Sequence, residues 1–156
     1  MTYQKFTWRR GFLSKTTTIY EGGKPLGTIN WHSLTGKKAA ATWRDDRYWL
    51  KPPASKRKCA TVYRVPSGEA LEKAVFKGFV RRVFIPDKPG EYLHWTYANF
   101  WQTRWQWRSG SLPVISYRLK SRLGAEKGEI LVHEQAMHSS MHLVVFGLFI
   151  RRCMQY

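Results

Sequence analysis

The sequence has little cysteine and no apolar leader. Its two cysteines, Cys59 and Cys153, are too few for a disulfide scaffold, and they form no C-x-x-C pair of the kind that binds metals. The first fifteen residues contain no apolar stretch typical of a signal peptide. We therefore expect a reduced protein in the cytoplasm.

Common catalytic motifs are also missing. The sequence contains no G-x-S-x-G, no P-loop and no G-x-G-x-x-G. The adjacent acidic pair, Asp45 and Asp46, falls in a predicted turn between basic residues, which does not favour hydrolysis by paired carboxylates. We expect neither enzymatic activity nor a cofactor. The alternative is an enzyme with an unrecognised site near His133, His138 and His142.

These histidines also raise the question of a metal site. His138 and His142 are four residues apart and would share one face of a helix, and two helical histidines can bind a metal. His133 and Glu134, however, do not stand at the H-E-x-x-H spacing with His138, and no carboxylate follows nearby. We expect these histidines to lie where the chain enters the core, as ordinary polar residues that bind no metal.

Acidic residues are scarce, and basic residues dominate the chain. There are 27 lysines and arginines against 10 acidic residues, a formal charge of +17. Because self-repulsion opposes compactness, this excess indicates a polyanionic partner, either an anionic membrane surface or nucleic acid. The alternative is a basic charge scattered evenly over the surface. The candidate anion-binding residues are Arg9, Arg10, Lys37, Lys38, Lys56, Arg57, Lys58, Arg81, Arg82, Arg104, Arg108, Arg118 and Lys120.

Most of the chain reads as short strands separated by turn signals. This spacing predicts an antiparallel meander that forms a sandwich or a barrel. Residues 69–77 are ambiguous; they favour a strand, although Leu71, Ala74 and Val75 would share a helical face. Residues 86–90 are predicted as a loop, and residues 124–128 as a turn. The predicted strands are 5–10, 16–20, 25–31, 37–43, 48–51, 57–65, 80–85, 101–108, 114–120 and 130–133.

Residues 101–108 carry the clearest strand pattern. One face would hold Trp101, Thr103, Trp105 and Trp107. Glutamines and arginines occupy the other face, so the period of two predicts a dry side and a wet, basic side. We expect the tryptophans in the core. The alternative is an exposed aromatic platform that stacks on single-stranded nucleic acid.

The chain finishes on its most hydrophobic run, residues 143–150, followed by Arg151 and Arg152. Eight apolar residues span about 12 Å as a helix, whereas a bilayer core needs roughly 20 such residues. A helix that is apolar on every side must be buried on every side, which a closed barrel achieves. The strands would then point their cations outward, and the two arginines would suit the end of the helix. The alternative is a sandwich in which residues 143–146 form a final strand.

We therefore predict a mainly β fold: a closed antiparallel β-barrel around a buried C-terminal helix at about residues 135–152. Residues 1–156 would form a single domain.

Three segments resemble the tubby C-terminal-like superfamily, which includes the tubby domain, the phospholipid scramblases and the LURP-one-related proteins. They are TTTIYEGGKPLGTINW (16–31), KKAAATWRDDRYWLKP (37–52) and LVVFGLFIRR (143–152). The resemblance implies a barrel of about twelve strands around a hydrophobic C-terminal helix, and binding of anionic lipids. The cysteine cluster and acidic calcium segment of scramblases are not found.

The expected function is a non-enzymatic module whose basic surface binds anionic phospholipid headgroups, cytoplasmic and peripheral at the membrane. A nucleic-acid-binding β-barrel that uses basic and aromatic residues is the alternative.

Overall fold

A computed structural model describes residues 3–33, 37–53, 59–76, 82–85, 93–122, 124–133 and 141–154, with Arg82 and Phe84 described by their backbone. These residues form twelve strands and one helix. The elements are β1 (Tyr3–Arg10), β2 (Thr16–Glu21), β3 (Lys24–Trp31), β4 (Ala39–Trp43), β5 (Asp46–Lys51), β6 (Cys59–Val65), β7 (Ala70–Phe76), β8 (Arg82–Ile85), β9 (Leu93–Tyr97), β10 (Arg104–Ser109), β11 (Leu112–Ser121), β12 (Glu126–His133) and α1 (His142–Met154).

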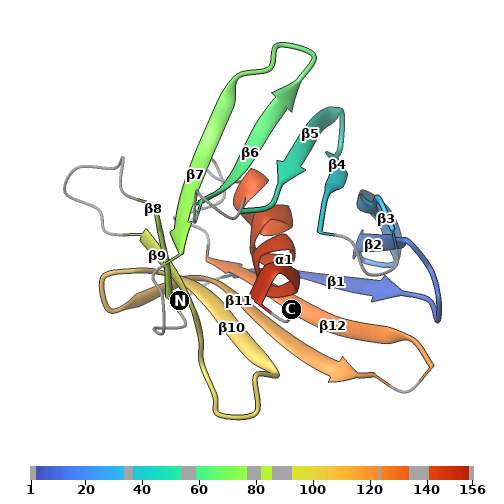
Figure 1. The fold of residues 1–156 in the computed structure, drawn as a ribbon. Helices are drawn as coiled ribbons and strands as arrows, with labels where there is room; N and C mark the ends of the chain where they lie inside the picture. The colour runs from blue at the N-terminus through green and yellow to red at the C-terminus, as the bar shows by residue number, and fades with distance from the viewer. Residues whose placement is uncertain are drawn as a thin grey trace.

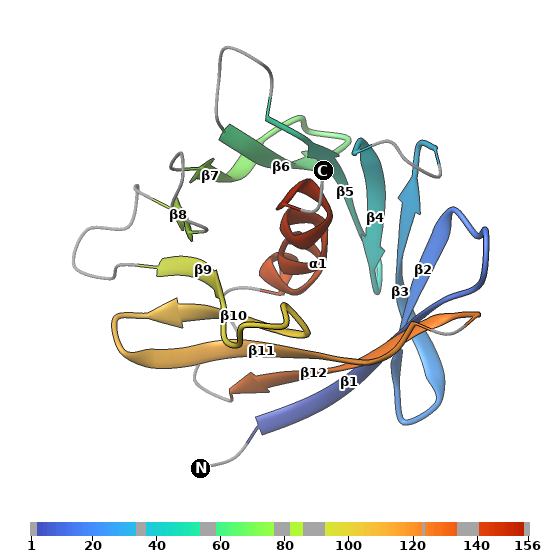
Figure 2. The same ribbon diagram turned by 60° about the horizontal axis from the view of Figure 1, so that its bottom comes forward.

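The strands form one antiparallel sheet whose order of pairing returns to its start. Each strand pairs with the next along the chain, and β1 also pairs with β12 over eight residue pairs, from Tyr3 with His133 to Arg10 with Glu126. The pairing is shortest between β7 and β8, which share two residue pairs. Figures 1 and 2 show α1 surrounded by these strands. The predicted mainly β fold, with antiparallel strands and a C-terminal helix, is confirmed.

Alternation of buried and exposed side chains explains why the sheet curves around a core. Trp105 and Trp107 of β10 are fully buried, as the period of two predicts. Ile115, Tyr117 and Leu119 of β11 are buried in the same way. Residues 70–76, the ambiguous segment, form a strand.

Two local predictions are wrong, and one strand has no counterpart among the predicted strands. Trp101 lies in the turn before β10 and is exposed, because β10 begins at Arg104. Residues 126–128 belong to β12 rather than to a turn, and the buried Gly128 lies so close to the Trp8 ring that a Cβ would meet it at 2.0 Å. Strand β9 was not predicted at all. The predicted loop at 86–90 lies outside the described residues.

Helix α1 occupies the core. All residues from 143 to 153 are buried, so the predicted burial of the apolar run is confirmed. The helix begins at His142 and extends to Met154, two residues beyond the predicted end. Residues 134–140, which were predicted to open the helix or precede it, lie outside the described part of the chain.

The strand wall holds the helix backbone by hydrogen bonds from aromatic side chains. Trp107 Nε1 donates to the Leu143 carbonyl at 3.0 Å, and Tyr117 Oη donates to the Val144 carbonyl at 2.8 Å. Trp95 Nε1 donates to the Gly147 carbonyl at 3.2 Å. Gly147 permits this close approach, since a Cβ there would lie 2.2 Å from Tyr117 Oη. Among the described helices, none is both long and apolar enough to cross a bilayer.

Candidate functional site

The two ends of the ring carry different residues. In an antiparallel sheet with sequential pairing, alternate connections lie at opposite ends. Connections 11–15, 32–38, 98–103 and 122–125 therefore share one end, which we call the basic end together with the strand residues beside them. Connections 22–23, 44–45 and 66–69 share the other, which we call the mixed-charge end.

Helix α1 runs from the mixed-charge end to the basic end. At its start, His142 Nε2 lies 3.2 Å from Oε1 of Glu72, near the beginning of β7. At its finish, Arg152 Nη2 donates to the Ser33 carbonyl of the 32–38 connection at 2.9 Å. The helix C-terminus therefore lies among the connections of the basic end.

Charge is divided unevenly between the two ends. Described acidic residues at the mixed-charge end are Glu21, Asp45, Asp46, Glu69 and Glu72. Glu126 is the acidic residue at the basic end within the described ranges. Cations at the mixed-charge end are Lys5, Lys24, Arg44, Arg47, Arg64 and Arg108. Cations at the basic end are Arg9, Arg10, Lys15, Lys37, Lys38, Lys51, Arg104, Lys120, Arg122, Lys127, Arg151 and Arg152.

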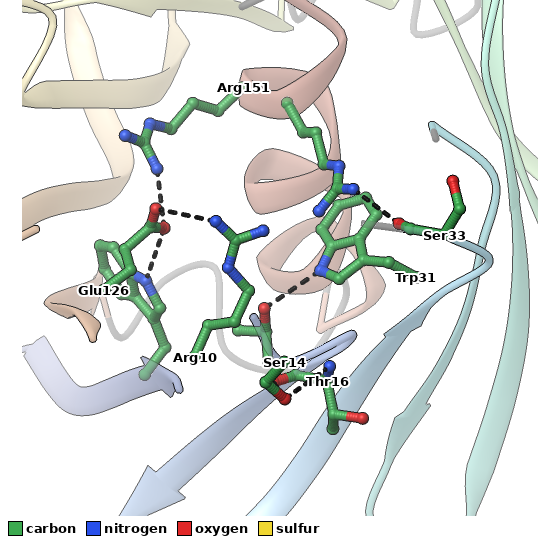
Figure 3. A network of polar contacts seen from close by, with 10 residues as sticks. Arg10, Ser14, Thr16, Trp31, Ser33, Glu126 and Arg151 are labelled. Atoms are coloured by element: carbon green, nitrogen blue, oxygen red, sulfur yellow. Dashed lines mark hydrogen bonds and ion pairs between the residues drawn. The ribbon is translucent and has the colours of Figure 1, made fainter. Parts of the chain in front are cut away.

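Arg151 is buried at the basic end, with 4% of its surface exposed. Its Nη1 donates to Glu126 Oε1 at 2.8 Å (Figure 3). Its guanidinium lies 4.5 Å from the Trp105 ring centroid. Burial lowers the pKa of Arg151, and the Glu126 carboxylate opposes that shift. Its Nε and Nη2 have no hydrogen-bond partner among the described residues. A cation is thus held inside the fold by one carboxylate and one aromatic ring.

Arg152 is buried beside it, with 5% exposure. Its guanidinium lies 4.1 Å from the centroid of the Trp31 ring, whose Nε1 donates to Thr17 Oγ1 at 3.1 Å. The Trp31 ring also stacks on the ring of Phe149, so the ring that contacts Arg152 belongs to the apolar core. The expectation that the cations of the strands point outward does not extend to these two arginines of the helix, because tryptophans of the strands accept their guanidiniums against the ring faces.

Glu126 connects the helix end to the sheet. Trp8 Nε1 donates to its Oε1 at 3.3 Å, and Arg10 Nη2 lies 3.7 Å from its Oε2 (Figure 3). The guanidiniums of Arg10 and Arg151 thus share one carboxylate, and Arg152 lines the same small hollow. The cluster therefore keeps a net positive charge, which favours an anion.

Two hollows adjoin this cluster. The inner one, of about 20 Å³, has room for roughly one water. The outer one, of about 340 Å³, falls in the size range of small-ligand sites. Arg10 and Glu126 line both, so they stand between the helix end and the outer hollow. The other residues of the outer hollow are Gly11, Phe12, Leu13, Ser14, Arg122 and Gly124.

The predicted anion-binding residues do not all come together. Arg9, Lys38 and Arg104 are exposed at the basic end, and Arg10 and Lys37 are half-buried there. Arg108 lies at the mixed-charge end and donates to the Ser111 carbonyl. Lys120, the second-to-last residue of β11, is exposed at the basic end and pairs with Glu129. Arg118, the register partner of Arg104, is exposed on the outer wall. Lys56, Arg57, Lys58, Arg81 and the side chain of Arg82 lie outside the described residues.

We did not predict from the sequence that Arg151 and Arg152 are buried or that Glu126 pairs with Arg151. A usable signal existed, because the two arginines continue an apolar helical run without a break. Arginines in the last turn of a core helix must either leave the core or find rings and a carboxylate there.

Metal-binding geometry is not seen in the described part of the chain, where no group of three His, Cys, Asp or Glu side chains converges. His138 lies outside the described residues. Burial raises the pKa of the Cys153 thiol to about 12, so this thiol is protonated at neutral pH.

Comparison of the chain with protein-family models, curated proteins and solved structures finds no match.

Proposed function

We propose that this chain is a non-enzymatic module that binds anionic phospholipid headgroups at a membrane surface through its basic end. The observation that carries the proposal is the uneven charge: the basic end has Glu126 as its described acid, whereas the mixed-charge end has acids and bases in similar numbers. An evenly basic surface would not distinguish the ends. A planar anionic surface meets one end of a barrel-like fold more easily than its curved wall.

The outer hollow supplies a place for a phosphate group. Arg10 and Arg122 line it, and arginine forks match phosphate oxygens with paired hydrogen bonds. Behind Arg10, the buried charge of Arg151 adds to the positive potential. Cations near an anionic leaflet contribute roughly 1 kcal/mol each to binding.

The resemblance to the tubby C-terminal-like superfamily belongs to the same proposal. Its support is the order of pairings that joins β1 to both β2 and β12, with a buried apolar helix inside. On this basis we propose that the sheet is a closed barrel of the tubby-like type.

Nucleic acid is the second polyanion to consider. A stacking platform on β10 is not available, because Trp105 and Trp107 are fully buried. Among the three tryptophans that suggested it, Trp101 remains exposed. Lipid therefore remains the proposed partner, and nucleic acid enters as an outcome of the test.

The test neutralises equal charge at each end. Arg9, Lys15 and Arg122 are exposed at the basic end, and Lys24, Arg44 and Arg64 are exposed at the mixed-charge end. We expect R9Q/K15Q/R122Q to weaken binding to phosphatidylcholine vesicles with about 30% phosphatidylserine roughly a hundredfold, and K24Q/R44Q/R64Q to weaken it far less. Co-sedimentation measures both.

Equal losses in the two triple variants would overturn the role of the basic end. Equal binding of the wild-type chain to pure phosphatidylcholine vesicles would overturn the function itself. Tighter binding to a single-stranded oligonucleotide than to anionic vesicles, with steep salt dependence, would favour nucleic acid instead.

A further inference from the structure

Two connections at the basic end carry large apolar side chains at their tips. Phe12 and Leu13 of the β1–β2 turn are 78% and 69% exposed. Phe100 and Trp101 of the β9–β10 turn are 88% and 77% exposed, and their rings meet edge to face at 5.4 Å. Such adjacent pairs are unfavourable in water, since burial of one such side chain is worth about 1.5–3 kcal/mol.

Both turns are held in a defined shape. In the first, Ser14 N donates to the Gly11 carbonyl at 3.0 Å, and Leu13 has a left-handed φ of 58°. In the second, Asn99 Oδ1 accepts hydrogen bonds from the backbone N–H groups of Thr103 and Arg104, each at 3.1 Å. These bonds fix the backbone at the base of each tip, so the apolar side chains do not fold back onto the sheet.

Other exposed apolar side chains are single and lie elsewhere. Trp49 is on the outer wall in β5, and Tyr3 begins β1 at the mixed-charge end. Leu112 begins β11 at that same end. Isolated exposed residues of this kind are common on soluble proteins. The pairing of apolar residues in neighbouring positions is therefore a property of the basic end within the described chain.

The surroundings of the two tips indicate what covers them. In the ring, β11 and β12 lie between β10 and β1, so the connection with Arg122 separates the two apolar turns. Lys15 follows the first tip and Arg104 follows the second, both exposed. Apolar tips that alternate with cations match a bilayer with anionic headgroups, where aromatic side chains sit at the level of the headgroups.

We infer that the chain docks end-on, with the tips of the β1–β2 and β9–β10 turns inserted into the headgroup layer of an anionic bilayer. This inference rests on the proposed lipid binding and adds its orientation and its apolar contacts. Helix α1 would then point its C-terminus at the membrane, and the mixed-charge end would face away from it.

Paired substitutions with matched controls test the orientation. We expect F12S/L13S and F100S/W101S each to weaken co-sedimentation with phosphatidylserine-containing vesicles about tenfold. The controls W49S and L112S remove comparably exposed side chains away from the basic end and should bind like the wild-type chain. The thermal midpoint in the absence of lipid should stay close to that of the wild-type chain in all four variants, because the substituted side chains are exposed.

Fluorescence gives a second readout. Vesicles with brominated acyl chains should quench part of the wild-type tryptophan emission. W101F should lose most of that quenching, because Trp49, the other exposed tryptophan, lies on the outer wall and the rest are buried.

Wild-type binding to anionic vesicles with unchanged binding of both tip variants would overturn the end-on orientation and leave the proposed function intact. Failure of the wild-type chain to bind would overturn both. A lipid-independent dimer that the tip variants abolish would assign these turns to self-association and also overturn the inference.

Discussion

The two ends of helix α1 are held by polar contacts of different character. At the mixed-charge end, His142 meets Glu72, and a histidine can lose its charge while keeping a hydrogen bond. At the basic end, Arg151 meets Glu126, and an arginine remains charged. The first contact tolerates a neutral partner, whereas the second makes one carboxylate indispensable. The comparison shows that the fold keeps a permanent buried charge at the end that we propose to face anionic lipid.

Loss of the Glu126 charge should have the largest effect. Arg151 is 4% exposed, so E126Q leaves a buried cation without a counterion, and such a loss typically costs about 3–5 kcal/mol. Because the Glu126 side chain is itself 21% exposed, we expect about 3 kcal/mol. Urea unfolding measures the change.

Removing the cation provides the matched control for that variant. R151M keeps much of the packing against Trp105 and leaves Glu126 beside Arg10, so it should cost less than E126Q. The double variant E126Q/R151M should be close to R151M alone. Additive losses in the double variant would show that the pair is not coupled, and the distinction between the two ends would fail.

The sequence predicts the core better than it predicts the polar ends. Residues 143–150 have no alternative to burial, and Trp105 and Trp107 alternate with polar neighbours, so both predictions are confirmed. The alternation does not extend to Trp101, because Gln102 has a left-handed φ of 59° that breaks the extended backbone. Periodicity alone contains no signal for where a strand begins.

Whether a given cation is buried or exposed could not be predicted without knowing its tertiary contacts. A rule that places charge outside works for Arg9 and Arg104 but fails for Arg151 and Arg152, because rings and a carboxylate from distant strands surround them. Glu126 is 25 positions from Arg151 in the chain, and Trp31 is 121 positions from Arg152, so no local pattern indicates these contacts. The uneven charge of the two ends likewise depends on the order in which the strands pair, which no local pattern indicates.

The Glu72 contact at the mixed-charge end should be weaker. E72Q retains an amide that can hydrogen-bond to His142, so we expect a loss of about 1 kcal/mol, near the value of one hydrogen bond. Urea unfolding under the conditions used for E126Q gives the comparison directly. A loss from E72Q as large as that from E126Q would mean that both helix termini depend on charge, and the asymmetry argued above would be wrong.

Between the two ends, on the outer wall of the sheet, loss of the Glu129 charge should have the smallest effect on stability, and that effect should depend on pH. Glu129 contacts Lys120 and Lys5, and the hydrogen bond from Lys120 lowers the pKa of Glu129 below its usual value of 4.5. A lowered pKa means that the folded chain binds this proton less readily than the unfolded chain. The contribution of Glu129 to stability is therefore present above pH 4.5 and is lost as the pH falls through the lowered pKa.

Both lysines are more than half exposed, so solvent screening keeps the contribution of their contacts with Glu129 below about 1 kcal/mol. We expect E129Q to lose that small amount at pH 7 and to differ least from the wild-type chain at strongly acidic pH. A difference that grows on acidification would contradict the sign, and a loss near that of E126Q would place the critical charge on the wall rather than at the basic end.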